Sequence, residues 1–151
     1  MSETSVRPAT AADADAVIKA FEWLFAPPGS RPALWDDTRA RNALLHTVAS
    51  DTEEVLVAEE RSRLVGFCTI ALDLHSIRFG PRAWVEDLAV DPSRRSRGIG
   101  KRLLDEAKRW AIARGATHLE LDSADSRIDA HRFYRREQPT WESRSFGWQL
   151  V

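Results

Sequence analysis

The stretch that decides the fold reads AWVEDLAVDPSRRSRGIGKRLL and spans residues 83–104. Its first part, residues 83–90, is rich in apolar strand formers and predicts a strand that Asp91-Pro92 ends. Its second part opens a helix over about residues 98–113, because apolar side chains recur there at helical spacing and Gly115 follows as a stop. The apolar stripe of this helix consists of Ile99, Leu103, Leu104, Ala107, Trp110 and Ala111.

The loop between this strand and this helix, Arg95-Ser96-Arg97-Gly98-Ile99-Gly100, has the properties of an anion cradle. Two glycines allow the backbone to approach a ligand closely, and the first N–H groups of a helix have no intrahelical acceptor. The helix dipole and the basic side chains favour a phosphate at this point. A glycine pair at a helix start is weak evidence alone, because a tight turn between helices or a capping glycine uses the same residues.

Two further features of the sequence bear on this loop. Leu103 stands where dinucleotide-binding folds have their third glycine, and no P-loop pattern occurs. Residues 94–114 hold eight basic and two acidic residues, whereas residues 51–60 hold five acidic residues and no basic one. This uneven charge indicates a local anion site, with a solvated helix face as the alternative.

The rest of the chain predicts further helices and strands. We expect strands over residues 5–7, 54–58, 64–72, 118–122 and 141–151, and helices over about 10–25, 35–49 and 129–136. Residues 26–32 contain three prolines and indicate a loop. The order of these elements predicts one mixed α/β domain over residues 1–151.

Composition excludes several classes of protein. The 151 residues are 43% apolar and 30% charged, which is ordinary for one globular domain. A net charge of −1 gives no general reason for nucleic-acid binding. No secretory signal and no membrane-length apolar run occur, so we expect a cytoplasmic protein with no membrane partner.

The cysteine and the histidines of the chain indicate neither a reactive thiol nor a metal site. Cys68 is the only cysteine, lies in an apolar run and is expected to fill the core. The four histidines are not spaced as metal ligands, so no metal site is expected. They are His46, His75, His118 and His131.

The run from Val85 to Pro92, with Arg95-x-x-Gly98-x-Gly100 and Leu103-Leu104 after it, resembles motif A of the GCN5-related N-acetyltransferases. Downstream, residues 130–136 read AHRFYRR and resemble the A-x-x-F-Y-R-R segment of the same family. One predicted helix and one predicted strand separate the two motifs, as the family requires. The resemblance covers about residues 54–150.

Within that family, the sequence looks most like the spermidine/spermine acetyltransferase branch. This finer resemblance rests on Glu86-Asp87, Phe133-Tyr134 and the sequence FGWQL at residues 146–150. The chain departs from the family pattern at two places: Arg127 stands where asparagine is common, and Gln138-Pro139 stands where a Gly-Phe pair is usual. The resemblance implies an α/β fold with a central mixed, mostly antiparallel β-sheet, splayed at the cofactor slot and flanked by about four helices.

The resemblance also implies how acetyl-CoA binds. Its pyrophosphate would be held by the backbone N–H groups of Arg95, Ser96, Arg97, Gly98, Ile99, Gly100 and Lys101. Its pantetheine arm would lie beside the preceding strand as an added strand, in contact with the backbone of Leu88 and Val90.

Glu86 is the catalytic base that the resemblance implies. An alkylammonium has a pKa near ~10.4, so making it neutral near pH ~7.4 costs about 4 kcal/mol, and a carboxylate can meet that requirement. Trp84 lies on the same strand face and is a candidate for lining the amine pocket, whereas strand alternation predicts that Asp87 points to the opposite face. An ion pair with an arginine is the alternative role for Glu86.

Tyr134, the only tyrosine, matches the family's acid. A phenol with a pKa of ~10 is a weaker acid than a thiol near ~8.5, so a hydrogen bond to the developing sulfur charge is the main contribution expected. The alternative is a core aromatic beside Phe133. Adjacent helix residues point about 100° apart, so Phe133 can be core while Tyr134 faces a cleft.

The implied function is that of an acyltransferase, an acetyl-CoA-dependent N-acetyltransferase that acts directly on a primary amine of a small molecule or peptide. The alternative is a non-catalytic acyl-CoA-binding or sensor module on the same fold. Nucleic-acid binding by the basic helix is disfavoured by the acidic remainder of the chain. The resemblance leaves a homodimer open, and loops near residues 26–35 and 73–82 are expected to build the acceptor pocket.

Overall fold

The computed structural model describes residues 3–151, which divide after Leu121 into two compact units. The elements of the first unit are β1 (Ser5–Pro8), the short 3-10 helix η1 (Ala11–Asp13), α1 (Ala14–Ala20), α2 (Glu22–Phe25), α3 (Asp37–Val48), β2 (Glu53–Glu60), β3 (Arg63–Ser76), β4 (Gly80–Val90), the 3-10 helix η2 (Pro92–Arg94), α4 (Ile99–Ala113) and β5 (His118–Leu121). The second unit contains α5 (Ile128–Arg136).

The first unit is built on a mixed sheet with strand order β1-β2-β3-β4-β5. The first four strands are antiparallel neighbours, and β5 joins β4 in parallel. The predicted mixed, mostly antiparallel sheet is therefore confirmed. The continuous apolar run in β3 arises because residues on both of its faces are buried, including Val65, Phe67, Cys68 and Ile70.

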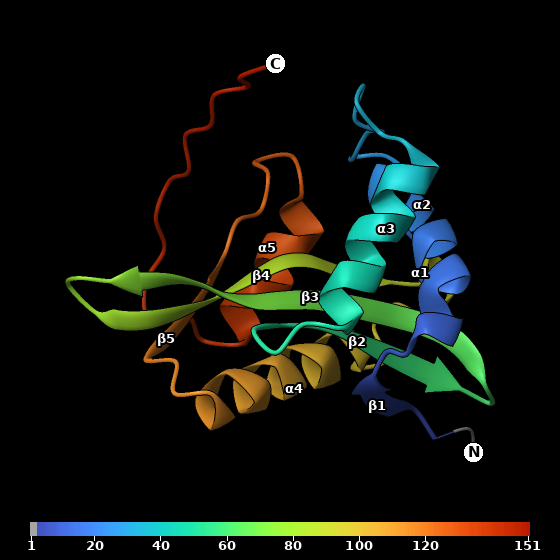
Figure 1. The fold of residues 1–151 in the computed structure, drawn as a ribbon, viewed down its shortest axis with the longest axis horizontal. Helices are drawn as coiled ribbons and strands as arrows, with labels where there is room; N and C mark the ends of the chain where they lie inside the picture. Colours follow the sequence, from blue (N-terminus) through green and yellow to red (C-terminus); the bar gives the residue numbers. More distant parts are fainter. Residues whose placement is uncertain (1–2) are drawn as a thin grey trace. The chain divides into compact units, whose positions relative to one another are not determined.

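Helices cover both faces of this sheet (Figure 1). The predicted stripe of α4 is buried against one face, where it packs with Leu56, Val65, Cys68 and Ile70. On the other face, α1 and α3 pack with Val55, Val57, Phe67 and Ala89. Cys68 is fully buried among apolar residues, which raises the pKa of its thiol and agrees with the predicted filling role.

The ladder between β3 and β4 contains a β-bulge at Glu86. Thr69 pairs with Asp87, but the next residue, Ile70, pairs with Val85, so Glu86 falls between two rungs. Strand alternation therefore does not run unbroken along β4.

The bulge reverses which residues of β4 face α4. Before it, Ala83 and Val85 belong to the core on the α4 side. After it, Leu88 and Val90 pack on that side, and Ala89 belongs to the core beneath α1 and α3. Odd-numbered residues face α4 before the bulge, and even-numbered residues face α4 after it.

The predicted amino-terminal helix is interrupted. Phe21 separates α1 from α2, and the backbone N–H of Phe25 still bonds to the carbonyl of Phe21 at 3.1 Å. The predicted second helix begins two residues later than expected, at Asp37, because the Asp36 side chain caps it by accepting a hydrogen bond from the Arg39 N–H at 2.7 Å.

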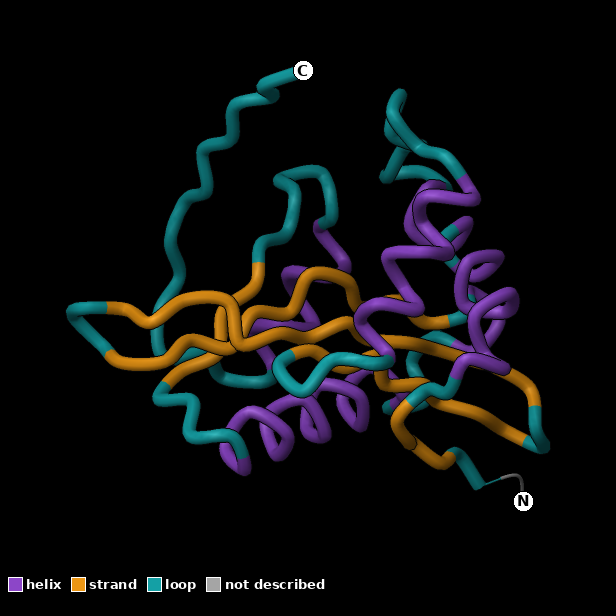
Figure 2. Tube along the Cα trace, in the orientation of Figure 1, coloured by secondary structure: helices purple, strands orange, loops and turns teal. Residues whose placement is uncertain are grey.

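The prediction of a strand over residues 141–151 is wrong. These residues contain no helix or strand, and Figure 2 draws them as loop. The apolar side chains Phe146, Trp148 and Leu150 of this stretch are 74%, 81% and 91% exposed. Strand-forming residues form a strand only where a neighbouring strand and a core receive them. α5 agrees with the predicted helix over 129–136 and begins one residue earlier.

Candidate active site

The loop between η2 and α4 has the backbone conformation that a cradle for an anion requires. Ser96 has φ 63° and Gly98 has φ 79°, both in the left-handed region, while Arg95 between η2 and Ser96 is extended. Gly98 is the N-cap residue of α4, and Ser96, Arg97 and Gly98 are exposed. Left-handed residues next to a helix start turn successive N–H groups toward one point, which forms an anion-binding nest.

Ion pairs and hydrogen bonds fix the start of this cradle to the sheet. The guanidinium of Arg94 donates to Glu60 of β2 at 3.1 Å, and Glu60 also accepts from Thr4 at 2.9 Å. Asp91 accepts from the backbone N–H of Ser93 at 2.9 Å. Burial alone would raise the pKa of Asp91, but the hydrogen bonds from Ser93 and nearby arginine charges lower it below its usual range.

The basic residues of the segment divide into two groups. On α4, Lys101 pairs with Asp105 at 3.1 Å and Arg109 pairs with Glu106 at 3.0 Å, as the solvated-face alternative expects. Arg95 and Arg97, in contrast, are exposed on the cradle itself. The local positive charge at the cradle therefore comes from the side chains of Arg95 and Arg97 and from the partial positive charge at the N-terminus of α4.

The edge of β4 that leads into the cradle is open. β4 pairs with β5 only from Arg82 to Val85, where β5 ends at Leu121. Within residues 3–151, no strand pairs with that edge of β4 from Glu86 to Val90. This stretch contains Leu88 and Val90, so backbone groups of β4 are available there to an extended ligand arm.

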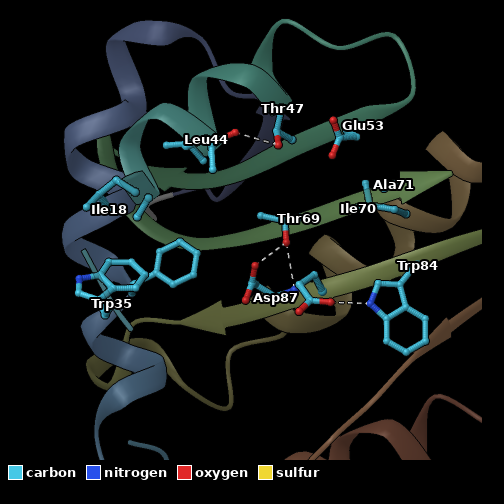
Figure 3. A pocket seen from close by; sticks show the side chains of 14 residues that line it. Ile18, Trp35, Leu44, Thr47, Glu53, Thr69, Ile70, Ala71, Trp84 and Asp87 are labelled. Carbon is cyan, nitrogen blue, oxygen red and sulfur yellow. Dashed lines mark hydrogen bonds between the residues drawn. The ribbon is translucent and has the colours of Figure 1, made fainter. Parts of the chain in front are cut away.

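A cavity of about 300 Å³ lies on the α1 and α3 side of the sheet at the bulge (Figure 3). Three carboxylates and three large aromatic side chains contribute to its wall. Within the described part of the chain, no Lys, Arg or His lines it. The lining residues are Ile18, Phe21, Trp35, Ala40, Ala43, Leu44, Thr47, Glu53, Thr69, Ile70, Ala71, Trp84, Glu86 and Asp87.

Glu86 lines this cavity and is held by Trp84. The indole N–H of Trp84 donates to the Glu86 carboxylate at 2.6 Å, and Glu86 is exposed. No ion pair joins Glu86 to an arginine among residues 3–151, so the structure does not support that alternative. Arg82 stacks on the Trp84 ring at 4.9 Å from its centroid, and its charge is paired with Asp73 at 2.8 Å.

Asp87 also lines the cavity, so its predicted position on the opposite face is wrong. The reason is the bulge, which lets consecutive residues of β4 reach the same side. Thr69 donates to the Asp87 carboxylate at 2.7 Å and accepts from the Asp87 backbone N–H at 3.0 Å, as the dashed lines in Figure 3 show. Burial, opposed by the Thr69 hydrogen bond and aided by the charge of Glu86, raises the pKa of Asp87 to about 6.

Tyr134 lies on α5, in the second unit. Its ring packs against Phe133 with centroids 5.2 Å apart, and both residues are half-buried. Arg127 is the N-cap residue of α5, and Gln138 follows the helix with φ 56°. The first unit thus brings together Glu86, Leu88, Val90 and the cradle, whereas the role of Tyr134 stays a prediction.

Sequence reasoning missed most of the residues that line the cavity. Of the two loops expected to build an acceptor pocket, only Trp35 contributes, and residues 73–82 are a hairpin whose strands extend to Ser76 and from Gly80. Thr69 was missed because it lies in an apolar strand and gains its role only through the bulge. The signal that could have identified it is a single threonine in an apolar strand that pairs with a strand containing two carboxylates.

The described residues hold no cluster of three or more His, Cys, Asp or Glu side chains that could bind a metal. Among the same residues, no helix has the length and apolarity that crossing a membrane requires.

Comparison with known proteins places this geometry in a family. The profile of the acetyltransferase (GNAT) family matches residues 16–138. The fold is similar to that of aminoglycoside N-acetyltransferase AAC(6')-Iy in complex with CoA, with a TM-score of 0.84 and 17% identity over 99% of this chain and 95% of that chain.

Two curated proteins are similar in part of their sequence. Uncharacterized N-acetyltransferase YhdJ of Bacillus subtilis is 45% identical over 64 residues, or 42% of this chain. Aminoalkylphosphonate N-acetyltransferase of Salmonella typhimurium is 33% identical over 81 residues, or 54% of this chain. The chain spans 45% and 53% of the lengths of these two relatives. From the family match, which covers most of its length, the chain belongs to the acetyltransferase (GNAT) family.

Proposed function

We propose that this protein transfers an acetyl group from acetyl-CoA directly to a primary amine of a small molecule or peptide. The observation that carries this proposal is the course of β4. From Glu86 to Lys101, the chain passes from the acidic cavity, along the open edge of β4, to the loop that forms the cradle for phosphate.

The cradle and the open edge fit the parts of coenzyme A. The N–H groups from Arg95 to Lys101 would hold the pyrophosphate, since two left-handed residues and a helix start converge there. The backbone of Leu88 and Val90 would hold the pantetheine arm by strand addition. Bound in this way, acetyl-CoA would supply an acetyl thioester to the region of the bulge.

The cavity beside the bulge fits a cationic amine. Its lining carries three carboxylates and no basic side chain among the described residues, and its aromatic wall suits both an apolar body and a cation. Glu86, held by the Trp84 indole at 2.6 Å, would receive the ammonium group and help to remove its proton, directly or through a water.

Tyr134 would act at the leaving sulfur. The family resemblance of the segment at residues 130–136 supports this role. Its phenol would donate a hydrogen bond to the charge that develops there.

The test is an assay of CoA release from acetyl-CoA with a panel of amines. The panel contains aminoglycosides, aminoalkylphosphonates, polyamines, amino acids and peptides with free amino termini. We expect at least one amine to raise free-thiol release about tenfold or more above the amine-free rate, with the acetylated amine as product. Saturable CoA binding without release for any amine would contradict transfer and favour the non-catalytic acyl-CoA sensor.

A further inference from the structure

We propose that Asp87 is the carboxylate of the acceptor cavity that takes the proton from the amine, and that Thr69 positions it. This inference rests on the proposed acetyl transfer and divides the work that the sequence assigned to Glu86 alone. Glu86 would hold the incoming ammonium group, and Asp87 would take the proton that leaves the nitrogen.

The bulge is the first observation behind this assignment. Without it, Asp87 would share the face of Ala83 and Val85, which is the apolar core against α4. With it, Asp87 and Glu86 are both in the wall of one cavity. Two consecutive strand residues can meet the same ligand only at such an irregularity.

The contact with Thr69 is the second observation. The Thr69 hydroxyl accepts from the Asp87 N–H at 3.0 Å and donates to the Asp87 carboxylate at 2.7 Å. One side chain therefore fixes both the backbone of the bulge and the direction of the carboxylate. A proton acceptor needs this kind of fixed orientation toward its substrate.

The charges around Asp87 are the third observation. Glu86 on β4 and Glu53 on β2 are the other acids of the cavity, and Cys68 on β3 is the buried thiol next to Thr69. From α1 and α3 the cavity receives only apolar side chains and Thr47, and His46 of α3 lies 3.7 Å from Glu53 with its own side chain 81% exposed. Asp87 is half-buried among these groups, which raises its pKa to about 6, close to the value an efficient base needs near neutral pH.

The step balances within the cavity. One N–H bond of the ammonium group breaks first, and its proton forms an O–H bond on Asp87, which frees the nitrogen lone pair. That lone pair then forms the bond to the acetyl carbon of the thioester, and a second N–H bond breaks as its proton passes to water. The carbon–sulfur bond breaks, and the sulfur leaves with the electron pair and takes a proton from Tyr134 or solvent. Asp87 then returns its proton to water, directly or past Glu86, before the next turnover.

The first experiment compares pH profiles of kcat/KM for the best amine of the panel. We expect a rising limb in the parent near the pKa of Asp87, about 6. Asp87→Asn should lose that limb and lower kcat by about 100-fold or more. Asp51→Asn, an exposed residue outside the cavity lining, is the matched control and should keep the parent profile.

Two more variants separate proton acceptance from a structural role. Thr69→Val removes a donor to the charged carboxylate, so the limb should move to higher pH by up to about one unit, whereas Thr69→Ser should restore it. Glu86→Gln removes a negative charge beside Asp87, so this variant should keep the rising limb of the pH profile, at a lower pH than in the parent. A limb that disappears in Glu86→Gln but remains in Asp87→Asn would assign proton acceptance to Glu86 and overturn the inference.

The second experiment needs no acetyl-CoA. The carboxyl ¹³C resonance of Asp87, assigned by its absence in Asp87→Asn, should titrate with a midpoint near 6 and at higher pH in Thr69→Val. A midpoint in the ordinary aspartate range would overturn the assignment. If the parent acetylates no amine, the proposed function itself fails; if the parent is active and Asp87→Asn keeps its pH profile, only the role of Asp87 fails.

Discussion

The cavity lies at the bulge of β4 and the cradle lies in the loop between η2 and α4, and the two sites are made in different ways. The cradle is formed by backbone within seven consecutive residues, from Arg95 to Lys101, in a locally basic segment. The cavity is formed by side chains from α1, α3, β2, β3 and β4, and its charged groups are all acidic among the described residues. A local backbone site can therefore be recognised from sequence, whereas a cavity depends on register between distant strands.

The largest effect is expected from a change in the cradle. Gly98→Asp places a negative charge and a side chain at a left-handed residue where the pyrophosphate would lie. We expect CoA affinity to fall by at least about 100-fold, measured by titration calorimetry. The matched control is Gly115→Asp, because Gly115 at the other end of α4 has nearly the same φ, 81°, and equally open surroundings.

This pair of variants distinguishes the cradle from general damage to α4. Both changes strain the backbone by a similar amount, so both should lower stability by about 1–2 kcal/mol. Only the change at Gly98 should weaken CoA binding. Equal CoA affinities in two folded variants would remove the cradle from the binding site.

The next effect tests a residue outside both regions. Tyr134→Phe removes one hydroxyl and keeps the ring that packs on Phe133 at 5.2 Å. We expect kcat to fall by about 100-fold, with CoA and amine affinities nearly unchanged. Steady-state kinetics with calorimetry for both ligands measure this split. Full activity would leave Tyr134 as a packing residue.

Ionisation of Asp87 in the cavity should affect the stability of the fold as well as the activity. The pKa of Asp87 is raised from 3.8 to about 6 in the folded state, so the folded protein binds more protons than the unfolded chain between these values. Stability from this group is present below pH ~4 and is lost as pH rises through ~6.

Asp87→Asn therefore should stabilise the fold above pH ~7, by up to about 3 kcal/mol, and have little effect below pH ~4. Urea unfolding at both pH values measures the difference, and Asp51→Asn serves again as the exposed control. If the variant is no more stable than the parent at high pH, ionisation of Asp87 does not destabilise the folded protein.

Much of the fold and of the cradle could be predicted because the signals are local. The stripe from Ile99 to Ala111 repeats at helical spacing, and Gly98 marks the left-handed cap that begins α4. The position of Asp87 could not be predicted, because alternation assumes an unbroken ladder and the bulge depends on how β3 and β4 pair. The strand expected over residues 141–151 was wrong for a related reason: strand-forming residues do not by themselves supply a partner strand.

The smallest effect is expected at the bond between Trp84 and Glu86. Trp84→Phe keeps an aromatic wall but removes the indole N–H that donates to Glu86 at 2.6 Å. Because Glu86 is exposed, this hydrogen bond should contribute only about 1 kcal/mol, so kcat/KM for the amine should fall about fivefold. CoA affinity should stay at the parent value, since the cradle is separate. A larger loss for CoA than for the amine would show that the two regions are not independent.

The most direct test is a crystal structure of the protein with coenzyme A bound. We expect the pyrophosphate within hydrogen-bond distance of N–H groups between Arg95 and Lys101, and the pantetheine arm along the open edge of β4 at Leu88 and Val90. Coenzyme A bound elsewhere, or a cradle filled by one of the protein's own side chains while the cofactor is present, would contradict the assignment.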